Sequence, residues 1–305
     1  MVEVAFRDGE FSPLSEITVS IETTSLHYGT NVFEGIRAYW NADAEELYVF
    51  RADAHFRRLH TSASLYGMLL PYAVEDLCKI TVDLLVRNKV RDDVYIRPLL
   101  YKSDTSIICW NEGLKDSFVI YDKPFKMFEG GLRCCVSLWR QVEGNAAPCR
   151  GKIGGMYALR ALARHEALVL GYDEAIMLSA NGKVAEGTGE NLFLVVEDKL
   201  VTPSTGEDLL AGITRASILE LASSVLGVEA VEREVNRSEL YVADEVFLCG
   251  TGAEVTPVLA VDGRDVGDGR PGPATTALRR VYLDVVRGKS DSYLHRLLPV
   301  YGVSA

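Results

Sequence analysis

One lysine in this chain has surroundings that could support covalent chemistry. Lys152 stands in the run GKIGG, residues 151–155, where three glycines leave space for a bulky ligand beside the amine. A lysine amine can attack a carbonyl group to form a Schiff base, and it can also transfer a proton. Most lysines are solvated surface residues, so Lys152 alone would not predict catalysis. The prediction depends on the segments that follow it.

A carboxylate and two glycine-containing turns follow Lys152 along the chain. Residues 186–191, EGTGEN, place Glu186 at the start of a tight turn. Residues 212–215, GITR, precede a predicted helix, and a helix N-terminus binds phosphate through its N–H groups and its dipole. Thr214 could also be an ordinary helix cap. Residues 250–252, GTG, follow an apolar strand but lack the third glycine and the helix of a dinucleotide-binding fingerprint.

The composition is that of a globular enzyme. The 305 residues carry a net charge of −11, with 48% hydrophobic and 25% charged residues. An acidic surface repels the phosphates of nucleic acids and anionic lipids, so neither partner is expected. The first residues show no signal peptide, and no apolar run has membrane-spanning length. We therefore expect a cytoplasmic protein.

The cysteines and histidines do not indicate a metal site. None of the six cysteines forms a C-x-x-C pair, and the five histidines are scattered along the chain. Cys134 and Cys135 are adjacent on a predicted strand, so their side chains should point to opposite faces. We expect six reduced thiols and no bound metal.

Hydrophobic periodicity predicts a first part that mixes helices and strands. Strands are expected at residues 17–21, 35–40, 46–51, 94–101 and 117–121, and helices at 54–70 and 74–88. The first of these helices has its apolar residues on one stripe, and Pro71 ends it.

A segment containing proline and paired glycines, residues 123–131, is the best candidate for a linker. Beyond it, strands are expected at 132–139, 175–178, 191–196 and 245–249, and helices at 156–170, 214–226, 238–241 and 275–287.

In their order along the chain, these segments resemble the cofactor site of branched-chain amino acid aminotransferases, which belong to the fold-type IV class of pyridoxal-phosphate enzymes. The matching cofactor segments are residues 151–157, 186–193, 212–215 and 250–254. Residues 27–37 and 95–99 resemble the substrate signatures of the family. No single segment is decisive, but together and in this order they are specific.

The resemblance implies an α+β two-domain fold, similar to that of D-amino-acid aminotransferase. It implies a small N-terminal α+β domain at 1–122, an interdomain loop at 123–131 and a larger C-terminal domain at 132–305. The C-terminal domain would be α/β and barrel-like, and it would bind the cofactor pyridoxal 5′-phosphate (PLP).

The resemblance also assigns cofactor-binding roles. Lys152 would form the Schiff base with PLP and move a proton between substrate and cofactor. Tyr157 would donate to the phenolic oxygen of PLP, and Glu186 would keep its ring nitrogen protonated, with Asn191 as a supporting residue. Residues 55–60, HFRRLH, resemble the family's helix that carries a phosphate-binding arginine, which would be Arg58. Ile213, Thr214 and Thr251 would also hold the phosphate.

The substrate side is implied in the same way. Phe33 would line an apolar side-chain pocket, and Tyr95 and Arg97 would bind the substrate carboxylate. Tyr28 would reach the site of a neighbouring subunit in a homodimer or larger homo-oligomer. Gly252 and Ala253 would belong to the turn near the substrate carboxylate.

The implied reaction is transfer of the amino group of L-leucine, L-isoleucine or L-valine to 2-oxoglutarate through the PLP aldimine and the pyridoxamine form. Residues 102–110 replace a loop that is usually rich in glycine. Related fold-type IV enzymes therefore remain alternatives, acting on D-amino acids, (R)-amines, aminodeoxychorismate or an unusual amino acid of specialised biosynthesis. A binding or regulatory protein without turnover is the third possibility.

Overall fold

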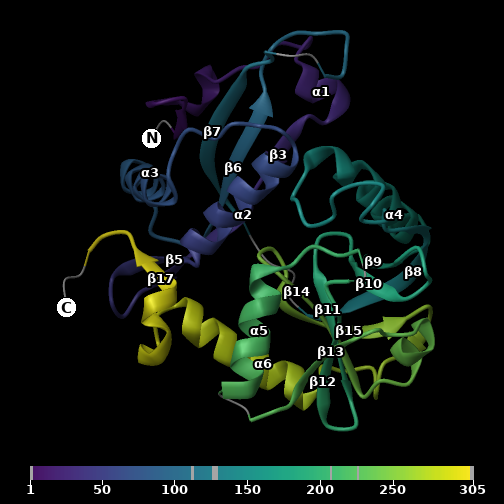
Figure 1. Ribbon diagram of the computed structural model, residues 1–305. Coiled ribbons are helices and arrows are strands. Elements are labelled where there is room, and N and C mark those ends of the chain that lie inside the picture. The colour runs from purple at the N-terminus through teal and green to yellow at the C-terminus, as the bar shows by residue number, and fades with distance from the viewer. Residues whose placement is uncertain (1–2, 111–112, 126–129, 207, 225–226, 303–305) are drawn as a thin grey trace. The chain divides into compact units, whose positions relative to one another are not determined.

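The computed structural model describes residues 3–110, 113–125, 130–206, 208–224 and 227–302. The chain divides into two compact units, each with its own sheet (Figure 1). The first unit comprises residues 1–126, 151–156 and 284–305, and the second comprises residues 127–150 and 157–283.

The segment that carries Lys152 therefore groups with the N-terminal unit. The predicted domain boundaries assigned residues 151–156 and 284–305 to the C-terminal domain, whereas the described residues of both stretches, 151–156 and 284–302, group with the first unit. Of the predicted interdomain loop, residues 126–129 lie outside the described residues. The boundaries at 122 and 132 stay a prediction.

The first unit is built on an eight-stranded sheet. Its strands are β1 (Val4–Arg7), β2 (Glu10–Pro13), β3 (Asn31–Phe33), β4 (Ile36–Asn41), β5 (Glu46–Phe50), β6 (Val94–Lys102), β7 (Asp116–Pro124) and β17 (Leu297–Pro299). They are ordered β17-β5-β4-β6-β7-β1-β2, and β3 pairs with β6. The antiparallel register sets Arg37 opposite Tyr95 and Phe33 opposite Leu99. Residues from both predicted substrate signatures thus meet on neighbouring strands.

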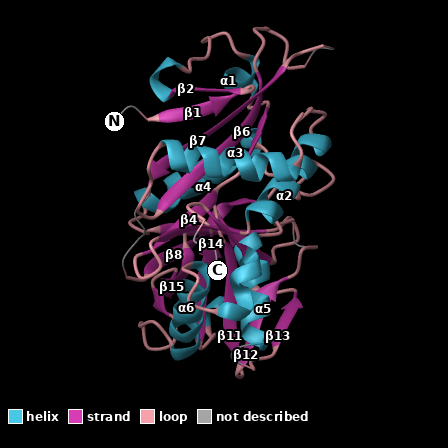
Figure 2. Cartoon of the chain, turned by 90° about the vertical axis from the view of Figure 1, so that its left-hand side faces the viewer, coloured by secondary structure: helices cyan, strands magenta, loops and turns pink. Residues whose placement is uncertain are grey.

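Two helices, α2 (Ala52–Leu65) and α3 (Val74–Arg87), pack against each other and against this sheet (Figure 2). Helix α2 buries Phe56, Leu59 and Ala63 on one stripe, as its periodicity predicts. Helix α3 has Glu75 and Asp76 in its first turn and a basic residue in its last, which suits the helix dipole. A short helix, α1 (Thr24–Tyr28), precedes β3.

The second unit contains a nine-stranded sheet. Its strands are β8 (Leu132–Arg140), β9 (Glu174–Leu178), β10 (Val184–Gly187), β11 (Asn191–Val196), β12 (Lys199–Pro203), β13 (Ala230–Arg233), β14 (Glu245–Gly250), β15 (Glu254–Val261) and β16 (Arg264–Asp265). They are ordered β10-β9-β8-β15-β14-β11-β12-β13, and β16 pairs with β15. Most pairs are antiparallel, but β8 pairs in parallel with both β9 and β15, and β12 pairs in parallel with β13.

Helices cover parts of this second sheet. Helix α4 (Tyr157–Val169) packs on β8 and β9, whereas α5 (Ile213–Ser224) packs on β13 and β14. Cys134 lies in the main apolar core of the unit and Cys135 faces α4, so the predicted opposite directions of these two thiols are confirmed. Helix α6 (Pro273–Val286) contains the boundary between the two units.

The α+β fold with two sheets confirms the predicted fold class. Most predicted helices and strands are present, with ends that differ by a few residues. The expectation that Pro71 ends the helix at 54–70 is wrong, because α2 ends at Leu65, before Gly67 with its φ of +61°. The strand expected at residues 17–21 is wrong, because this segment pairs with no strand, and Val19 and Ile21 are 57% and 78% exposed. Its alternating pattern belongs to an exposed loop. The helix expected at 238–241 is a 3-10 helix, Arg237–Tyr241.

None of the helices in the described ranges has the length and apolar character needed to cross a membrane. Within the same ranges, no group of three His, Cys, Asp or Glu side chains is placed to hold a metal ion.

Candidate active site

The backbone of Lys152 is held on both sides by the first unit. Its amide N–H donates to the Oγ of Ser62 on α2 at 2.9 Å, and its carbonyl accepts from the amide of Phe33 at 3.1 Å. The next residue, Ile153, forms an isolated bridge with Val32 on β3. The loop around the lysine is therefore fixed to a strand and a helix, although its sequence is rich in glycine.

The glycines near Lys152 allow the chain to approach itself closely. Gly29 has φ +64°, and its carbonyl accepts from the amide of Gly155 at 3.1 Å. A Cβ on Gly29 would lie 2.5 Å from the Cα of Gly155, and a Cβ on Gly154 would collide with the side chain of Asn31. These contacts require residues without side chains, so the glycine run serves the packing of the loop as well as leaving room beside the amine.

The Lys152 side chain lies beside the predicted substrate residues. Its Nζ is 4.9 Å from the centroid of the Phe33 ring. The Arg97 guanidinium lies 4.8 Å from the centroid of the same ring and 5.2 Å from that of Tyr95. Arg97 also donates to the hydroxyl of Tyr95 at 3.0 Å. One amine, one guanidinium and two aromatic rings thus form a single cluster in the first unit.

Arg58 forms a buried ion pair that sequence reasoning did not predict. Its Nε and Nη2 donate to the two carboxylate oxygens of Glu34 at 2.6 and 2.8 Å. His55 Nδ1 contacts Glu34 at 2.7 Å. This fork fixes the plane of the guanidinium.

The charge states of this trio follow from burial and pairing. Burial would raise the pKa of Glu34, but Arg58 and His55 outweigh that effect and hold the pKa well below its usual range. For His55, burial together with the charges of Arg58 and Lys152 lowers the pKa, against the opposing pull of Glu34. The carboxylate is therefore ionised, and a neutral His55 donates its Nδ1–H to it.

Tyr28 lies at the divergent loop rather than in the cluster around Lys152. Its hydroxyl donates to the carbonyl of Ile107 at 2.6 Å, and both residues line a cavity of about 490 Å³. Tyr28 is 42% exposed and Ile107 is 93% exposed. Within the divergent loop, residues 107–110 are exposed, whereas Lys102 is buried.

In the second unit, Glu186 is the centre of a buried polar network. The side chain is buried, and its Oε1 accepts from Arg160 Nη2 at 2.5 Å and from Gln141 Nε2 at 2.6 Å. Its Oε2 accepts from Asn191 Nδ2 at 3.2 Å, and the amide of Leu210 lies 3.3 and 3.4 Å from the two oxygens. Four donors from separate segments therefore hold this carboxylate.

Asn191 connects that network to the start of α5. Its Nδ2 also donates to the carbonyl of Leu210 at 2.9 Å, and a Cβ on Gly212 would collide with its Oδ1. Helix α5 begins one residue later, at Ile213, and Thr214 is buried in its first turn. The predicted carboxylate and the predicted phosphate-binding helix end are therefore fixed to each other within one unit.

Thr251, Gly252 and Ala253 form the turn between β14 and β15. The carbonyl of Ala253 accepts from the hydroxyl of Thr256 at 2.6 Å. A Cβ on Gly250 would lie 3.4 Å from the carbonyl oxygen of Gly189, so this turn approaches the turn that follows Glu186. The predicted residues Tyr157, Glu186, Asn191, Ile213, Thr214, Thr251, Gly252 and Ala253 all belong to the second unit, whereas Tyr28, Phe33, Arg58, Tyr95, Arg97 and Lys152 belong to the first.

Sequence reasoning missed four residues that hold the predicted ones in place. These are Glu34, Ser62, Gln141 and Arg160. Ser62 follows Arg58 by four residues on a helix, which is a signal for a shared face. No spacing in the sequence connects Gln141 or Arg160 to Glu186.

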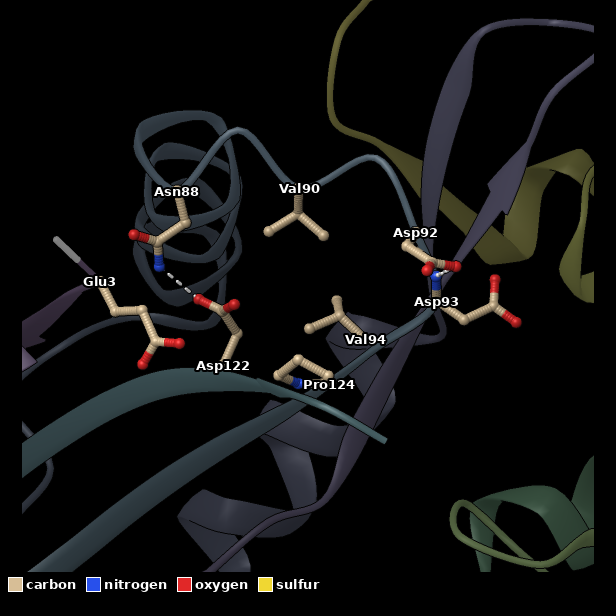
Figure 3. Close-up of a pocket in the computed structure, with 8 residues that line it drawn as sticks. All are labelled: Glu3, Asn88, Val90, Asp92, Asp93, Val94, Asp122 and Pro124. Carbon is tan, nitrogen blue, oxygen red and sulfur yellow. Dashed lines mark hydrogen bonds between the residues drawn. The ribbon is translucent and has the colours of Figure 1, made fainter. Parts of the chain in front are cut away.

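A separate small hollow in the first unit does not contain any predicted site residue. It measures about 220 Å³ and is lined by Glu3, Asn88, Val90, Asp92, Asp93, Val94, Asp122 and Pro124 (Figure 3). Asn88 donates to Asp122 at 2.5 Å across one wall (Figure 3). Burial raises the pKa of Asp122.

Comparisons with known proteins agree with this arrangement. The sequence model of the class IV amino-transferases matches residues 31–261. A probable branched-chain-amino-acid aminotransferase from Aquifex aeolicus is 46% identical over 98% of this chain and 97% of its own length. The chain belongs to the class IV aminotransferases.

Solved structures make the comparison more specific. The branched-chain aminotransferase from the thermophilic archaeon Thermoproteus uzoniensis, solved with norvaline, has a TM-score of 0.94 and 41% identity, covering 99% of this chain and all of the other. The branched-chain amino acid aminotransferase from Thermobaculum terrenum, solved in its PLP form, has a TM-score of 0.95 and 38% identity, covering 99% of each chain. The predicted family, enzyme class and PLP cofactor are confirmed at this level, and the alternative readings are not favoured.

Proposed function

We propose that this chain is a PLP-dependent transaminase that moves the amino group of L-leucine, L-isoleucine or L-valine to 2-oxoglutarate. The observation that carries the proposal is the cluster in which the Lys152 amine and the Arg97 guanidinium lie on the ring of Phe33. It combines a reactive amine, a cation for a carboxylate and an apolar wall for a side chain.

The residues present suit PLP in both units. A buried, multiply bonded carboxylate at Glu186 can keep a ring nitrogen protonated, and the start of α5 offers main-chain N–H groups to a phosphate. Gly212 keeps that helix end free of a side chain where Asn191 approaches. Arg58, oriented by Glu34, would contribute a fixed cation toward the phosphate.

PLP supplies a carbonyl carbon that amines attack and a ring that accepts the electron pair left when the substrate loses its α-proton. On the protein side, Lys152 would carry out the proton transfer. Its Nζ would take the proton from the substrate Cα and deliver it to C4′ of the cofactor, a general-base step worth about 10²–10⁴ in rate. Tyr157 would donate to the phenolic oxygen and Glu186 would hold the proton on the ring nitrogen.

Substrate recognition would fall to the first unit. Arg97 and Tyr95, already bonded to each other at 3.0 Å, would bind the α-carboxylate. Phe33 would contact an apolar side chain. Glutamate carries a second carboxylate in its side chain. An arginine within an otherwise apolar pocket would let one pocket accept both this side chain and the apolar side chain of a branched-chain amino acid. The turn at Thr251, Gly252 and Ala253 would border the substrate, and Asn191 would support Glu186.

We also propose a homodimer or larger homo-oligomer in the cytoplasm. Tyr28 and Ile107 are hydrogen-bonded to each other and exposed on the surface of the first unit. This exposed surface supports a role in contacting another subunit. Six cysteines without a disulfide suit a reducing compartment.

The proposal is tested by mixing the purified, PLP-loaded protein with single amino donors and following the visible absorption band of the cofactor. Loss of the band with L-leucine, but not with D-alanine or an (R)-amine, is expected. Loss only with D-alanine or the amine would overturn the substrate assignment, and a protein that takes up no PLP would overturn the reaction itself.

A further inference from the structure

Helix α4 carries an arginine, Arg160, inside the second unit rather than on its surface. The residue is 5% exposed, and its Nη2 donates to Glu186 Oε1 at 2.5 Å. Its guanidinium lies 5.0 Å from the centroid of the Tyr157 ring, and its Nη1 is 3.4 Å from the carbonyl of Thr188. One side chain thus contacts two of the residues proposed to bind the cofactor.

A purely structural role explains this burial poorly. Removing two charges from water costs several kcal/mol per ion, and apolar residues of similar volume often stabilise a protein as well or better. The same helix offers a contrast in Arg164, whose side chain is 35% exposed and pairs with the buried Glu174. The Arg160–Glu186 pair has both partners buried, at 6% and 2% side-chain exposure.

The bonds on Glu186 are unequal. Its two shorter bonds, from Arg160 and Gln141, both fall on Oε1, whereas the bond from Asn191 to Oε2 is 3.2 Å. The amide of Leu210 lies at 3.3 and 3.4 Å from the two oxygens. The arginine and the glutamine thus give the closer contacts within this set of four donors.

The ion pair with Arg160 also sets the charge of the Glu186 carboxylate. A buried carboxyl group without a cation takes up a proton, because desolvation disfavours its charged form. A neutral carboxylic acid cannot keep a pyridine nitrogen protonated. Burial would lower the pKa of Arg160, but the charge of Glu186 outweighs it and raises that pKa, so the guanidinium stays charged.

We propose that Arg160 is a positioning residue that keeps Glu186 ionised and oriented to hold the proton on the ring nitrogen of the cofactor. The inference rests on the proposed function, since it gives Glu186 that task. It adds that the charge of Glu186 is established by the protein before PLP binds. Gln141 supports the orientation but cannot replace the charge.

The first test needs no cofactor. Infrared spectra of the cofactor-free protein at neutral pH should show no protonated buried carboxyl in the wild type and one in Arg160→Met. The signal is assigned to Glu186 if it disappears in the double variant Arg160→Met/Glu186→Gln. Arg164→Met is the matched control, because Arg164 is on the same helix but pairs with Glu174. Any protonated carboxyl signal in this variant should persist when Glu186→Gln is added, which separates Glu174 from Glu186.

The second test uses the loaded enzyme. In single turnovers with L-leucine, Arg160→Met should slow loss of the cofactor band by about tenfold or more, within the range of a lost charge-assisted interaction. Added to Glu186→Gln, the same substitution should change the rate by less than about twofold, because residues that act as one unit are not additive. Arg160→Lys, which keeps the charge, should restore most of the rate.

A wild-type-like spectrum of cofactor-free Arg160→Met, or a full additional rate loss in the Glu186→Gln background, would overturn the proposal. If Arg160→Met does not fold, Arg160→Lys is used to test the proposal instead. An ionised Glu186 with partial activity supports the role, whereas a rate as low as that of Glu186→Gln with Glu186 still ionised contradicts it. Failure of the proposed function would look different, because the infrared result would hold while the wild type reacted with no L-amino acid.

Discussion

The amide of Lys152 donates to the Oγ of Ser62, and that hydroxyl donates in turn to the carbonyl of Arg58, each at 2.9 Å. One serine therefore connects the loop that carries the proposed catalytic lysine to the turn of α2 that carries the proposed phosphate ligand. Both bonds lie within the first unit. The position of Lys152 thus depends on a helix that lies about ninety residues earlier in the chain.

Replacing Ser62 by alanine should loosen this loop. The Lys152 amide would lose its acceptor, at a cost of about 1 kcal/mol in the free energy of unfolding. A misplaced lysine should lower the single-turnover rate with L-leucine by about tenfold. Urea unfolding and stopped-flow absorbance measure the two effects.

Thr81→Val is the matched control for that substitution. Thr81 is buried on α3 and donates to the carbonyl four residues earlier, as Ser62 does on α2, but it has no contact with Lys152. Thr81→Val should lower the free energy of unfolding and leave the single-turnover rate with L-leucine unchanged. Equal rate losses in both variants would contradict the positioning role of Ser62.

The close approach of Gly29 and Gly155 predicts a second effect. Gly29→Ala should lose more stability than Gly171→Ala, although both glycines have a positive φ, +64° and +81°. A Cβ at Gly29 meets the backbone of Gly155 at 2.5 Å, whereas nothing lies within 4 Å of one at Gly171. The difference should be about 1–3 kcal/mol, the usual range for overpacking. Equal melting temperatures would show that the approach is not tight in solution.

Glu34 predicts a pH dependence of stability. Its pKa in the folded chain is held below the ordinary value of 4.5 by Arg58 and His55, against burial, so the unfolded chain binds the proton more readily. The stabilisation is complete above pH 4.5 and is lost as the pH falls below it. Glu34→Gln should unfold about 3 kcal/mol more easily at neutral pH, because Arg58 loses its buried partner.

The same variant should show a shallower loss of stability than the wild type as the pH falls below 4.5. Glu16→Gln, at an exposed position, serves as the control and should follow the wild type. Parallel curves for Glu34→Gln and the wild type would mean that Glu34 does not carry the acid dependence.

Arg97 predicts a loss confined to substrate binding. Arg97→Met should reduce kcat/KM for L-leucine by about 10–100-fold, the cost of a charge-assisted hydrogen bond. Binding of PLP should change little, because Arg97 contacts Phe33 and Tyr95 and is not among the proposed phosphate ligands. Cofactor titration and steady-state kinetics separate the two. A loss of PLP affinity with unchanged KM would contradict this role.

Local sequence pattern predicted the regular elements well where it repeated over many residues. Helices α2 and α3 follow their apolar stripes, and β6 and β7 follow long strand patterns. Short edge strands such as β2 and β16 had too few residues to produce a pattern. Strand β15 was missed because it contains Pro257 and begins at Glu254, whose φ is +51°.

The candidate site was predicted as a set of residues, but not as a network. Lys152, Glu186 and Arg97 were named because the motifs around them resemble those of the family. The residues that hold them, such as Ser62 and Arg160, are 90 and 26 positions away from Lys152 and Glu186 respectively. The helical spacing of Ser62 from Arg58 indicates a shared face, but only the folded chain brings Ser62 to Lys152 and Arg160 to Glu186.

The most direct test of the account is to find where PLP attaches. The PLP-loaded protein is reduced with borohydride, digested and analysed by mass spectrometry. One phosphopyridoxyl group is expected, on Lys152, and none after Lys152→Ala. A label on another lysine, or labelling that survives Lys152→Ala, would contradict the central claim that Lys152 forms the covalent bond to the cofactor.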